Sequence, residues 1–386
     1  MGSVTAYVKP TNRCNVGCTH CYLPESVRAD KRRMTDETLL KTAHFIADMQ
    51  TRGRHGGAHV LWHGGEPLVL PASWYYEAGE VLDEVLPDHT ESMQTSLIPL
   101  RAEHVELIKN RFNGFVGSSV DFSQRQIKGS VDLYHRLWMK KVEMARAEGV
   151  TVVAGVVPTT RELGRERDIV RWFVERDFGA FNLDRYNAYG THFDDRPSNL
   201  QHSYFLIGMF EALMEEMERT GSAPLNGAIK GGMTGLLYGV GGDRWGGSCM
   251  NDFIVVEPDG ALNNCPDKSS FEDSFGTVQA GFEDFAKSRF RRKWIRHQNV
   301  DHKESHCMSC ENQHFCQSGC PITPNGVAHG EDECSGYRTF LRHVRDWVAR
   351  SDNRATAVAY LNQTVRRELL EKSTVYVSDN QGACAA

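Results

Sequence analysis

Residues 4–21 read VTAYVKPTNRCNVGCTHC, a strand-like segment that runs directly into a loop with three cysteines. Cys14, Cys18 and Cys21 are spaced closely enough for this loop to wrap around one inorganic cluster. The same spacing rarely permits an unstrained disulfide. Three thiolates on a [4Fe–4S] cluster leave one iron open to a small bidentate ligand, such as the amine and carboxylate of an amino acid. The segment therefore predicts an iron–sulfur site at the end of the first strand.

Short β-branched segments alternate with amphipathic helical segments from residue 4 to residue 220. The expected strands are Val4–Lys9, His59–His63, Met93–Ile98, Phe115–Val120, Val150–Val157 and Ala180–Tyr186. The expected helices are Asp36–Met49, Trp74–Val85, Arg101–Lys109, Val131–Glu148, Arg165–Arg176 and Tyr204–Arg219. Such alternation predicts an α/β fold with a parallel sheet and right-handed crossovers. Because six units are too few for a closed eight-stranded barrel, we expect a partial (βα)6 TIM-like barrel with the cysteine loop at its C-terminal mouth.

Seven further cysteines lie in the C-terminal part of the chain, and Cys384 stands alone in the tail. Residues 252–264 are typical of a hairpin with a turn-rich tip, and a Gly-rich stretch of little periodicity precedes them. We therefore expect four regions: a barrel at 1–222, a Gly-rich linker or loop at 223–248, a cysteine-rich auxiliary domain at 249–340, and C-terminal helices with a frayed tail at 341–386.

The composition is ordinary for a folded protein, with 40% apolar and 24% charged residues. A net charge of −6 does not favour a nucleic-acid partner. No apolar stretch reaches the length of a membrane span, and the N-terminal residues lack the features of a secretory signal. Many cysteines without such a signal indicate a reducing compartment. We expect a cytoplasmic protein that binds neither nucleic acid nor membrane.

The motif CNVGCTHC at residues 14–21 resembles the CxxxCxxC signature of the radical S-adenosylmethionine (SAM) enzymes. His20 stands where that family usually has an aromatic residue. The resemblance implies that the open iron binds the methionine part of SAM. It also implies that SAM is cleaved reductively to a 5′-deoxyadenosyl radical, which abstracts a substrate hydrogen. The alternative is a zinc site, but zinc prefers four ligands, and three cysteines with one histidine fit that preference poorly.

A second segment strengthens this resemblance. Gly64, Gly65 and Glu66 directly follow the second expected strand and match the family's GGE motif, which contacts the SAM amino group. Glycines let backbone carbonyls approach a ligand closely, and the Glu66 carboxylate can accept a hydrogen bond from an ammonium group. Taken alone, two glycines after a strand more often form an ordinary turn.

A third segment lies at the end of the fourth expected strand. Ser119 in Ser119-Val120-Asp121 matches the family's Ser-x-Asp segment and is a candidate SAM contact. After Asp121 the sequence departs from the family pattern, and the loop is shorter. Arg136 is a candidate partner of the SAM carboxylate, and a solvated arginine on a helix face is the alternative.

The C-terminal cysteines resemble the SPASM domain, the auxiliary-cluster module of enzymes that mature sulfatases and modify ribosomal peptides. The resemblance assigns Cys307, Cys310, Cys316 and Cys334 to an outer cluster and Cys249, Cys265 and Cys320 to an inner one. Sulfatase-maturing enzymes carry an eighth cysteine a few residues upstream of the first, where this chain has Asp243-Arg244-Trp245. We therefore expect three [4Fe–4S] clusters, with an inner cluster whose fourth iron is open or has an unusual ligand such as Asp243.

Two other positions are candidates for contact with the substrate. Sulfatase-maturing enzymes carry a proton-accepting aspartate immediately after the cysteine that matches Cys265, and here Asp267 lies one residue farther on. Asp267 is a candidate catalytic base, with an aspartate that caps a turn as the alternative. Asp184, Arg185 and Tyr186 end the sixth expected strand, where substrate contact and surface salt bridging are equally open.

Three functions are compatible with these features. The first is a radical SAM enzyme that oxidises or crosslinks a peptide or protein side chain, as in ribosomal-peptide maturation. Two auxiliary clusters suit it, because a substrate radical must lose an electron. Such an enzyme needs an electron donor of flavodoxin or ferredoxin type. Since Cys14 leaves no room for a recognition domain before it, we expect a separate leader-recognition protein or recognition by the barrel rim.

The second function is a radical SAM dehydrogenase that acts on a small molecule. Members of that group generally have a shorter auxiliary module with one cluster, so the seven C-terminal cysteines disfavour it. The third function is a non-catalytic iron–sulfur electron carrier. A carrier has no use for an open triad of cysteines beside a Gly-Gly-Glu segment.

Overall fold

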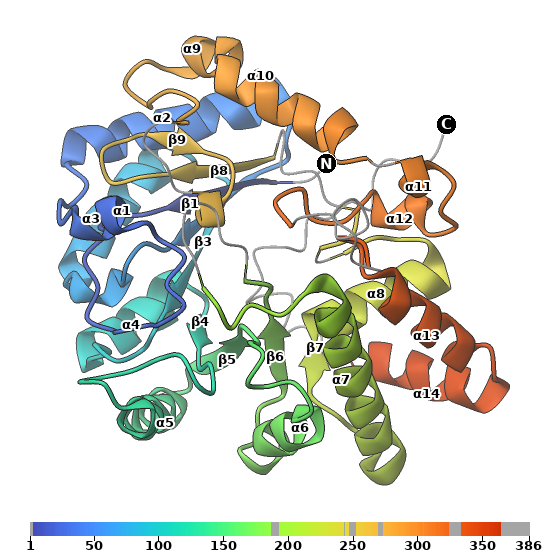
Figure 1. The fold of residues 1–386 in the computed structure, drawn as a ribbon. Helices are drawn as coiled ribbons and strands as arrows, with labels where there is room; N and C mark the ends of the chain where they lie inside the picture. The colour runs from blue at the N-terminus through green and yellow to red at the C-terminus, as the bar shows by residue number, and fades with distance from the viewer. Residues whose placement is uncertain are drawn as a thin grey trace.

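The computed structural model describes residues 3–186, 193–242, 244–246, 252–268, 273–303, 305–323 and 333–363. One sheet organises them, with strands in the order β7-β6-β5-β4-β3-β2-β1-β8-β9. All neighbouring strands in this order are parallel except β8 and β9. Figure 1 shows the barrel helices arranged around the outside of these strands.

The first six strands follow one another along the chain and along the sheet. They are β1 (Val4–Val8), β2 (Ala58–Trp62), β3 (His89–Thr95), β4 (Phe115–Ser119), β5 (Thr151–Val156) and β6 (Ala180–Leu183). The helices that accompany them are α1 (Glu25–Ala29), α2 (Asp36–Gly53), α3 (Ala72–Val85), α4 (Ala102–Arg111), α5 (Val131–Ala147), α6 (Glu166–Glu175) and α7 (Asn199–Thr220). The expected partial barrel is confirmed. Only β3 begins well before its expected start, at His89 rather than Met93. Its first residues are polar, so the hydrophobic pattern of the sequence did not reveal them as part of a strand.

The strand register separates the two faces of the sheet. Tyr7 pairs with Leu61 on one side and with Val255 on the other, and these three form an apolar cluster with Phe253. The alternate residues of the same strands belong to the main core beneath the helices. Because side chains alternate between faces along a strand, the positions two residues beyond this cluster also lie on the inner face. These positions carry the polar groups of the site.

The expected hairpin is present and extends the barrel sheet. It consists of β8 (Phe253–Val256) and β9 (Leu262–Asn263), which are antiparallel, and β8 pairs in parallel with β1. Its turn contains Gly260 at φ 86°, where a Cβ atom would lie 2.6 Å from the Gln279 side chain. Glycine adopts this backbone conformation without strain. The start of the cysteine-rich region is therefore part of the same sheet as the barrel.

The expectation of a linker or loop at 223–248 is wrong for its first half. After β7 (Leu225–Asn226), residues Gly227–Tyr238 form helix α8. A Cβ atom on Gly232 would lie 2.8 Å from the Phe340 ring, and one on Gly235 would lie 2.4 Å from the Phe315 ring. The glycines therefore allow two aromatic rings to pack closely against the helix backbone. Low helix propensity predicted a loop here, but tertiary packing overrides it.

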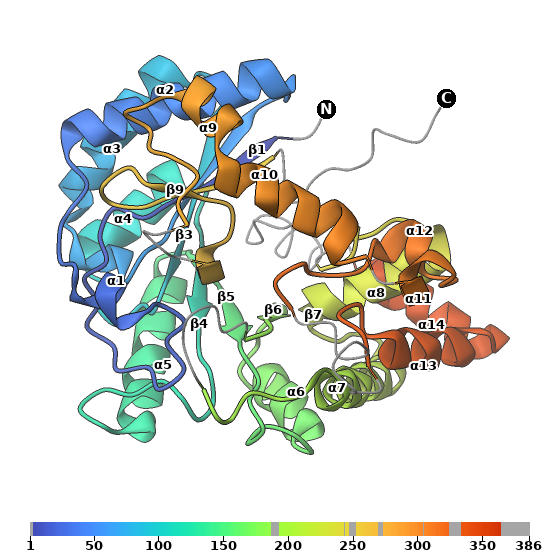
Figure 2. The same ribbon diagram turned by 45° about the horizontal axis from the view of Figure 1, so that its top comes forward.

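The C-terminal part is helical around the cysteines. Its elements are α9 (Phe282–Lys287), α10 (Arg289–Arg296), η3 (His297–Asp301), α11 (Ser305–Met308), α12 (Gln313–Cys316), α13 (Arg338–Val348) and α14 (Ser351–Leu361). Two short 3₁₀ helices, η1 (Pro67–Val69) and η2 (Pro266–Lys268), follow β2 and β9. Helices α13 and α14 pack against α7 and α8, as Figure 2 shows. Within the described ranges, no helix is long and apolar enough to cross a lipid bilayer.

Candidate functional site

The three N-terminal cysteines lie together in the loop after β1. The Cys18 thiol interacts electrostatically with Cys14 and Cys21, and Cys14 interacts with Cys21. Burial raises the pKa of Cys18 to about 12, so this thiol stays protonated unless a cation or metal is bound. In the described part of the chain, no three His, Cys, Asp or Glu side chains are grouped to hold a single metal ion.

The glycines after β2 dock against the backbone of this cysteine loop. The Gly65 amide donates to the Thr11 carbonyl at 3.0 Å, and the Glu66 amide donates to the Arg13 carbonyl at 2.8 Å. A Cβ atom on Gly64, where φ is 132°, would lie 2.4 Å from the Thr11 oxygen. One on Gly65 would lie equally close to the next carbonyl of the loop. The absence of side chains at both positions thus sets the path of the loop toward its first cysteine.

The Glu66 carboxylate is buried and anchored within the protein. Its Oε1 accepts a hydrogen bond from the Leu68 amide at 3.0 Å and another from the Thr95 hydroxyl. Its Oε2 accepts one from the Ser96 amide at 2.7 Å. These bonds tie the end of β2 to the end of β3. Since a carboxylate offers about four acceptor positions, about one remains for an ammonium group, and contact between Glu66 and SAM stays a prediction.

Asp121 is the centre of a buried network next to the cysteine loop. Its carboxylate accepts hydrogen bonds from Arg125 Nε and from the Val157 amide, both at 2.6 Å, and it lies 3.2 Å from His20 Nε2. Burial raises the pKa of Asp121, but Arg125 and His20 outweigh this effect and hold the pKa well below its ordinary value. Asp121 therefore carries a negative charge, which holds Arg125 and His20 in place.

Arg125 is the cation beside the thiols. It interacts electrostatically with Cys18, and the segment around it pairs with the cysteine loop, since the Gly17 amide donates to the Gln126 carbonyl at 2.9 Å. Arg136 is instead exposed on α5 and makes no hydrogen bond or ion pair with the cysteine loop. The short loop after β4 brings Arg125 to the site. Sequence analysis missed this residue, because only the pairing of the two loops reveals it.

Ser119 lies at the end of β4 on the inner face of the sheet. Its neighbour Ser118 points the other way and accepts a hydrogen bond from Trp138 of α5. The Ser119 hydroxyl accepts one from Gln94 Nε2 at 3.2 Å. Gln94 is a polar residue at an inward-facing position of β3, and its amide lies over Gly117, where a Cβ atom would be 2.0 Å away. The sequence analysis missed Gln94, although the alternation of β3 was the signal for it.

A buried ion pair lies on the inner face of the sheet, directly beyond the apolar cluster around Tyr7. Lys9 Nζ donates to Glu257 Oε1 at 2.8 Å, and this pair joins the ends of β1 and β8. On the other side of Lys9 lies His63, at the end of β2. Burial and the charge of Lys9 lower the pKa of His63 to about 3, so His63 is neutral at physiological pH. Its Nδ1 lies 3.5 Å from the Tyr22 hydroxyl.

Asp267 lies between the two groups of cysteines. It interacts electrostatically with Tyr22, which directly follows Cys21, and with Cys320 of the auxiliary region. It belongs to η2, directly after Cys265. The candidate base therefore lies near both the cysteine loop and the expected inner set.

The four expected outer cysteines lie together. Cys316 interacts electrostatically with Cys307, Cys310 and Cys334. A Cβ atom on Gly336 would lie 2.5 Å from the Cys316 sulfur, so only glycine leaves room for the sulfur there. The expected inner set is described only at Cys265 and Cys320. Cys249, Asp243 and Cys384 lie outside the described residues. Cluster ligation at both sets stays a prediction.

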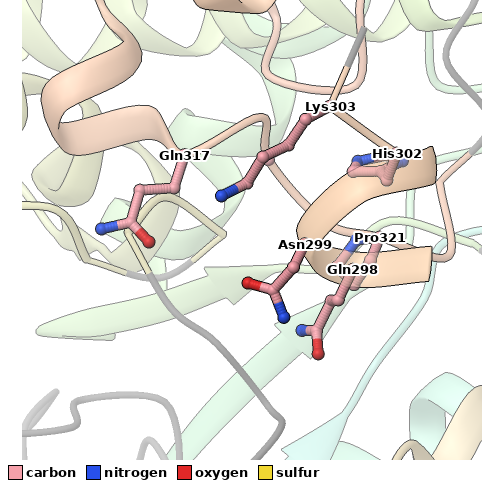
Figure 3. A pocket seen from close by; sticks show the side chains of 7 residues that line it. Gln298, Asn299, His302, Lys303, Gln317 and Pro321 are labelled. Carbon is pink, nitrogen blue, oxygen red and sulfur yellow. The ribbon is translucent and has the colours of Figure 1, made fainter. Parts of the chain in front are cut away.

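A polar pocket opens on the cysteine-rich region beside the outer set. It is lined by Gln298, Asn299, His302, Lys303, Gln317, Gly319 and Pro321. Figure 3 shows the side chain of Lys303 extending toward Gln317 on the other side of the pocket. Gln317 and Gly319 belong to the segment between Cys316 and Cys320, so the pocket exposes the chain next to these cysteines.

Comparison with protein families relates these features to a known superfamily. Residues 8–173 match the family model described as the Radical SAM superfamily. The chain carries a radical SAM domain. The match begins within β1 and ends in α6, so it contains the three cysteines of the loop, the Gly-Gly-Glu segment and Ser119.

Two curated relatives are serine-type anaerobic sulfatase-maturating enzymes. The one from Bacteroides thetaiotaomicron is 30% identical over 190 residues, which are 47% of this chain and 42% of that protein. The one from Klebsiella aerogenes is 21% identical over 354 residues, which are 86% of this chain and 82% of that protein. A third relative, an uncharacterized protein from Archaeoglobus fulgidus, is 30% identical over 117 residues, but these span only 25% of its length.

Solved structures share the fold of the whole chain. A structure of histidine-tagged anSMEcpe with bound AdoMet superposes with a TM-score of 0.76 at 17% identity, and the match covers 96% of this chain and 98% of that one. Streptococcus suis SuiB bound to S-adenosylmethionine superposes with a TM-score of 0.57 at 12% identity, covering 87% and 75%. This chain therefore shares its overall fold with both proteins.

Proposed function

We propose that this chain is a radical SAM enzyme of the SPASM type that abstracts a hydrogen from a peptide or protein side chain. One observation carries the proposal: three thiols, a docked Gly-Gly segment and the half-buried Arg125 meet at the inner mouth of the sheet. This set provides metal ligands, backbone without side chains and a cation in one place.

The donor set fits a [4Fe–4S] cluster with one open iron, because it offers three neighbouring thiols and the adjacent positive charge of Arg125. Cys14, Cys18 and Cys21 would hold it. When bound, the cluster supplies the electron that splits SAM into methionine and the 5′-deoxyadenosyl radical, which takes the substrate hydrogen. The chain itself positions SAM. In this account Arg125 binds the SAM carboxylate, in place of Arg136.

The remaining SAM contacts come from the ends of β2 and β4. Gly64 and Gly65 present backbone carbonyls without side chains in the way, and Glu66 keeps this segment fixed to β3. The Ser119 hydroxyl, held by Gln94, faces the same inner surface. These groups lie on neighbouring strands of a parallel sheet, whose carboxyl ends form one edge.

The C-terminal cysteines would hold two further clusters, which supply an acceptor for the electron that an oxidised substrate loses. The outer one would use the four grouped cysteines around Cys316, and the inner one Cys249, Cys265 and Cys320. The external electron donor would be of flavodoxin or ferredoxin type. Asp267 accepts the proton that leaves the substrate, and its position between Tyr22 and Cys320 supports this role over that of a turn cap.

A peptide or protein substrate is supported by what the structural relatives bind. One anSMEcpe structure, with a TM-score of 0.73, contains AdoMet and the Kp18Cys peptide. One SuiB structure, with a TM-score of 0.54, contains the precursor peptide SuiA. In this chain too, the end of the barrel that carries the cysteine loop faces the cysteine-rich region.

Co-expression tests this function directly. Small proteins encoded beside this chain are produced with it and weighed by mass spectrometry. We expect one of them to lose about 2 Da when it is oxidised or crosslinked, and to keep its mass beside Cys18→Ala. Unchanged masses throughout, together with turnover of a small molecule such as an amino sugar, would favour the dehydrogenase instead.

A further inference from the structure

The end of β6 holds a buried arginine with unused hydrogen-bond donors. Arg185 is 8% exposed, which rules out the alternative of a surface salt bridge. Its Nη2 donates to the Pro197 carbonyl at 2.6 Å and to Asn199 Oδ1 at 3.3 Å. Its Nε and Nη1 are shielded from water and have no hydrogen-bond partner, although the Tyr337 side chain lies beside the guanidinium. Neither of these two nitrogens has a hydrogen-bond acceptor in good geometry, and the Tyr337 side chain is the group that interacts with them.

The surroundings of Arg185 are positively charged. Arg244 lies next to it and donates to the Leu183 carbonyl at 2.7 Å, and it contacts His202 Nε2 at 3.0 Å. Burial lowers the pKa of Arg185, and the charges of Arg196 and Arg244 lower it further. The same arginines and burial hold the pKa of His202 well below its ordinary value. Among the described residues, no carboxylate forms an ion pair with Arg185, and it is Tyr337 that raises its pKa against the effect of burial.

A second feature of the fold adds to this positive potential. Helix α7 spans 22 residues and begins at Asn199, the residue that contacts Arg185. The N-terminus of a helix carries a partial positive charge and attracts anions. A buried guanidinium, two neighbouring arginines and a helix N-terminus thus converge on one place.

This place lies between the cysteine loop and the cysteine-rich region. Tyr186, next to Arg185, contacts His20 of the cysteine loop, with ring centroids 6.3 Å apart. On the opposite side, Tyr337 follows the outer cysteine Cys334 and belongs to the cysteine-rich region. The arginine group is separated from Ser119 and the proposed SAM contacts by strand β5. The arginine group therefore lies between the proposed SAM contacts and the cysteine-rich region.

We propose that Arg185 binds a carboxylate of the substrate. This inference rests on the proposed function, because it assigns to the peptide substrate an acidic side chain or a free C-terminus near the modified residue. A guanidinium presents its N–H groups as a planar fork that matches the two oxygens of a carboxylate. An unpaired buried charge is costly, and a bound acid supplies the missing partner. Because both nitrogens are shielded, the guanidinium turns, or a neighbouring segment moves, as the acid enters.

Short acids serve as probes of this site on the anaerobically reconstituted holoprotein. N-acetylglutamic acid α-amide mimics an acidic side chain, N-acetylglycine mimics a C-terminus, and N-acetylglutamine amide is the neutral control. At constant ionic strength, we expect one acid to raise the thermal unfolding midpoint and the neutral amide not to do so. The acid that acts identifies the source of the carboxylate. If neither acid raises the wild-type midpoint, the proposal is wrong.

Variants assign the effect to Arg185. We expect Arg185→Met to abolish the shift, and Arg185→Lys, which keeps the charge but loses the fork, to weaken apparent affinity by roughly 10-fold. Arg171→Met, at an arginine of α6 with 65% side-chain exposure, should respond as the wild type does. An unchanged shift in Arg185→Met or Arg185→Lys would overturn the proposal.

The probe assay does not depend on turnover, so it separates this proposal from the proposed function. Formation of 5′-deoxyadenosine from SAM and dithionite by the wild type tests the proposed function alone. Its absence in the wild type would count against the proposed function and leave the probe result intact.

Discussion

At the scale of single residues, Arg125 and Asp121 explain how a shortened loop keeps a cation at the thiols. Asp121 holds Arg125 from one side and His20 from the other, and all three are buried or nearly so. The negative charge of Asp121 fixes the guanidinium without removing its electrostatic contact with Cys18.

This assignment predicts opposite outcomes for two arginines. Arg125→Gln should weaken SAM binding to the reconstituted protein by roughly 10- to 100-fold, because a hydrogen bond to a charged group is lost. Arg136→Gln, at an exposed position of α5, should bind SAM as the wild type does. Equilibrium dialysis with labelled SAM measures both. A loss of affinity in Arg136→Gln with normal binding by Arg125→Gln would reverse the assignment.

His59 of β2 makes stability depend on pH. Burial lowers the pKa of His59 to about 4, and its two ring nitrogens contact Thr90 and Ser92. Between pH 6.5 and pH 4 the unfolded chain therefore binds a proton at His59 that the folded chain does not. Stability falls with decreasing pH in this window, at up to about 1.4 kcal/mol per pH unit for one group.

Urea unfolding of the metal-free protein at pH 6.5, 5.5 and 4.5 measures this effect. His59→Gln keeps polar groups at the position but does not titrate, so its stability should fall less steeply over the same range. Equal slopes for the wild type and His59→Gln would show that His59 is not held neutral by the fold.

At the scale of elements, the segment after β2 acts as a backbone clamp on the cysteine loop. Its two glycines contact carbonyl oxygens of the loop at distances that no side chain tolerates. The motif thus has a structural reason that precedes any contact with a ligand.

Gly65→Ala should therefore damage the N-terminal iron site selectively. The added Cβ atom would lie 2.4 Å from the Asn12 oxygen, so the loop that carries the first cysteine has to shift. Iron analysis after reconstitution should give about twelve irons per chain for the wild type and about eight for Gly65→Ala. Iron near twelve in Gly65→Ala, with normal SAM binding, would show that the clamp is dispensable.

The sequence predicted the periodic elements and missed those that depend on distant contacts. Hydrophobic alternation was enough for six strands and their helices. Helix α8 was missed because glycine disfavours helices locally, whereas Gly232 and Gly235 make room for Phe340 and Phe315, which lie far along the chain. In the site, cysteine spacing predicted the iron–sulfur ligands, but Arg125 depends on the pairing of two loops that the sequence does not display.

At the scale of the whole molecule, the barrel and the cysteine-rich region share one sheet. Strand β8 pairs with β1, the Lys9–Glu257 ion pair joins their ends, and α13 packs against α7 and α8. Cys265 and Asp267 follow β9 directly, so the sheet itself positions these two residues at the mouth of the barrel. This continuity supports the view that the two regions act on one substrate.

The central claim is that the cysteine loop supports reductive cleavage of SAM, and product analysis tests it most directly. The reconstituted protein is incubated anaerobically with SAM and dithionite, and 5′-deoxyadenosine and methionine are quantified. We predict equal amounts of both products from the wild type and none from Cys18→Ala. A wild-type protein with its full complement of iron that forms no 5′-deoxyadenosine would contradict the account and favour an electron carrier.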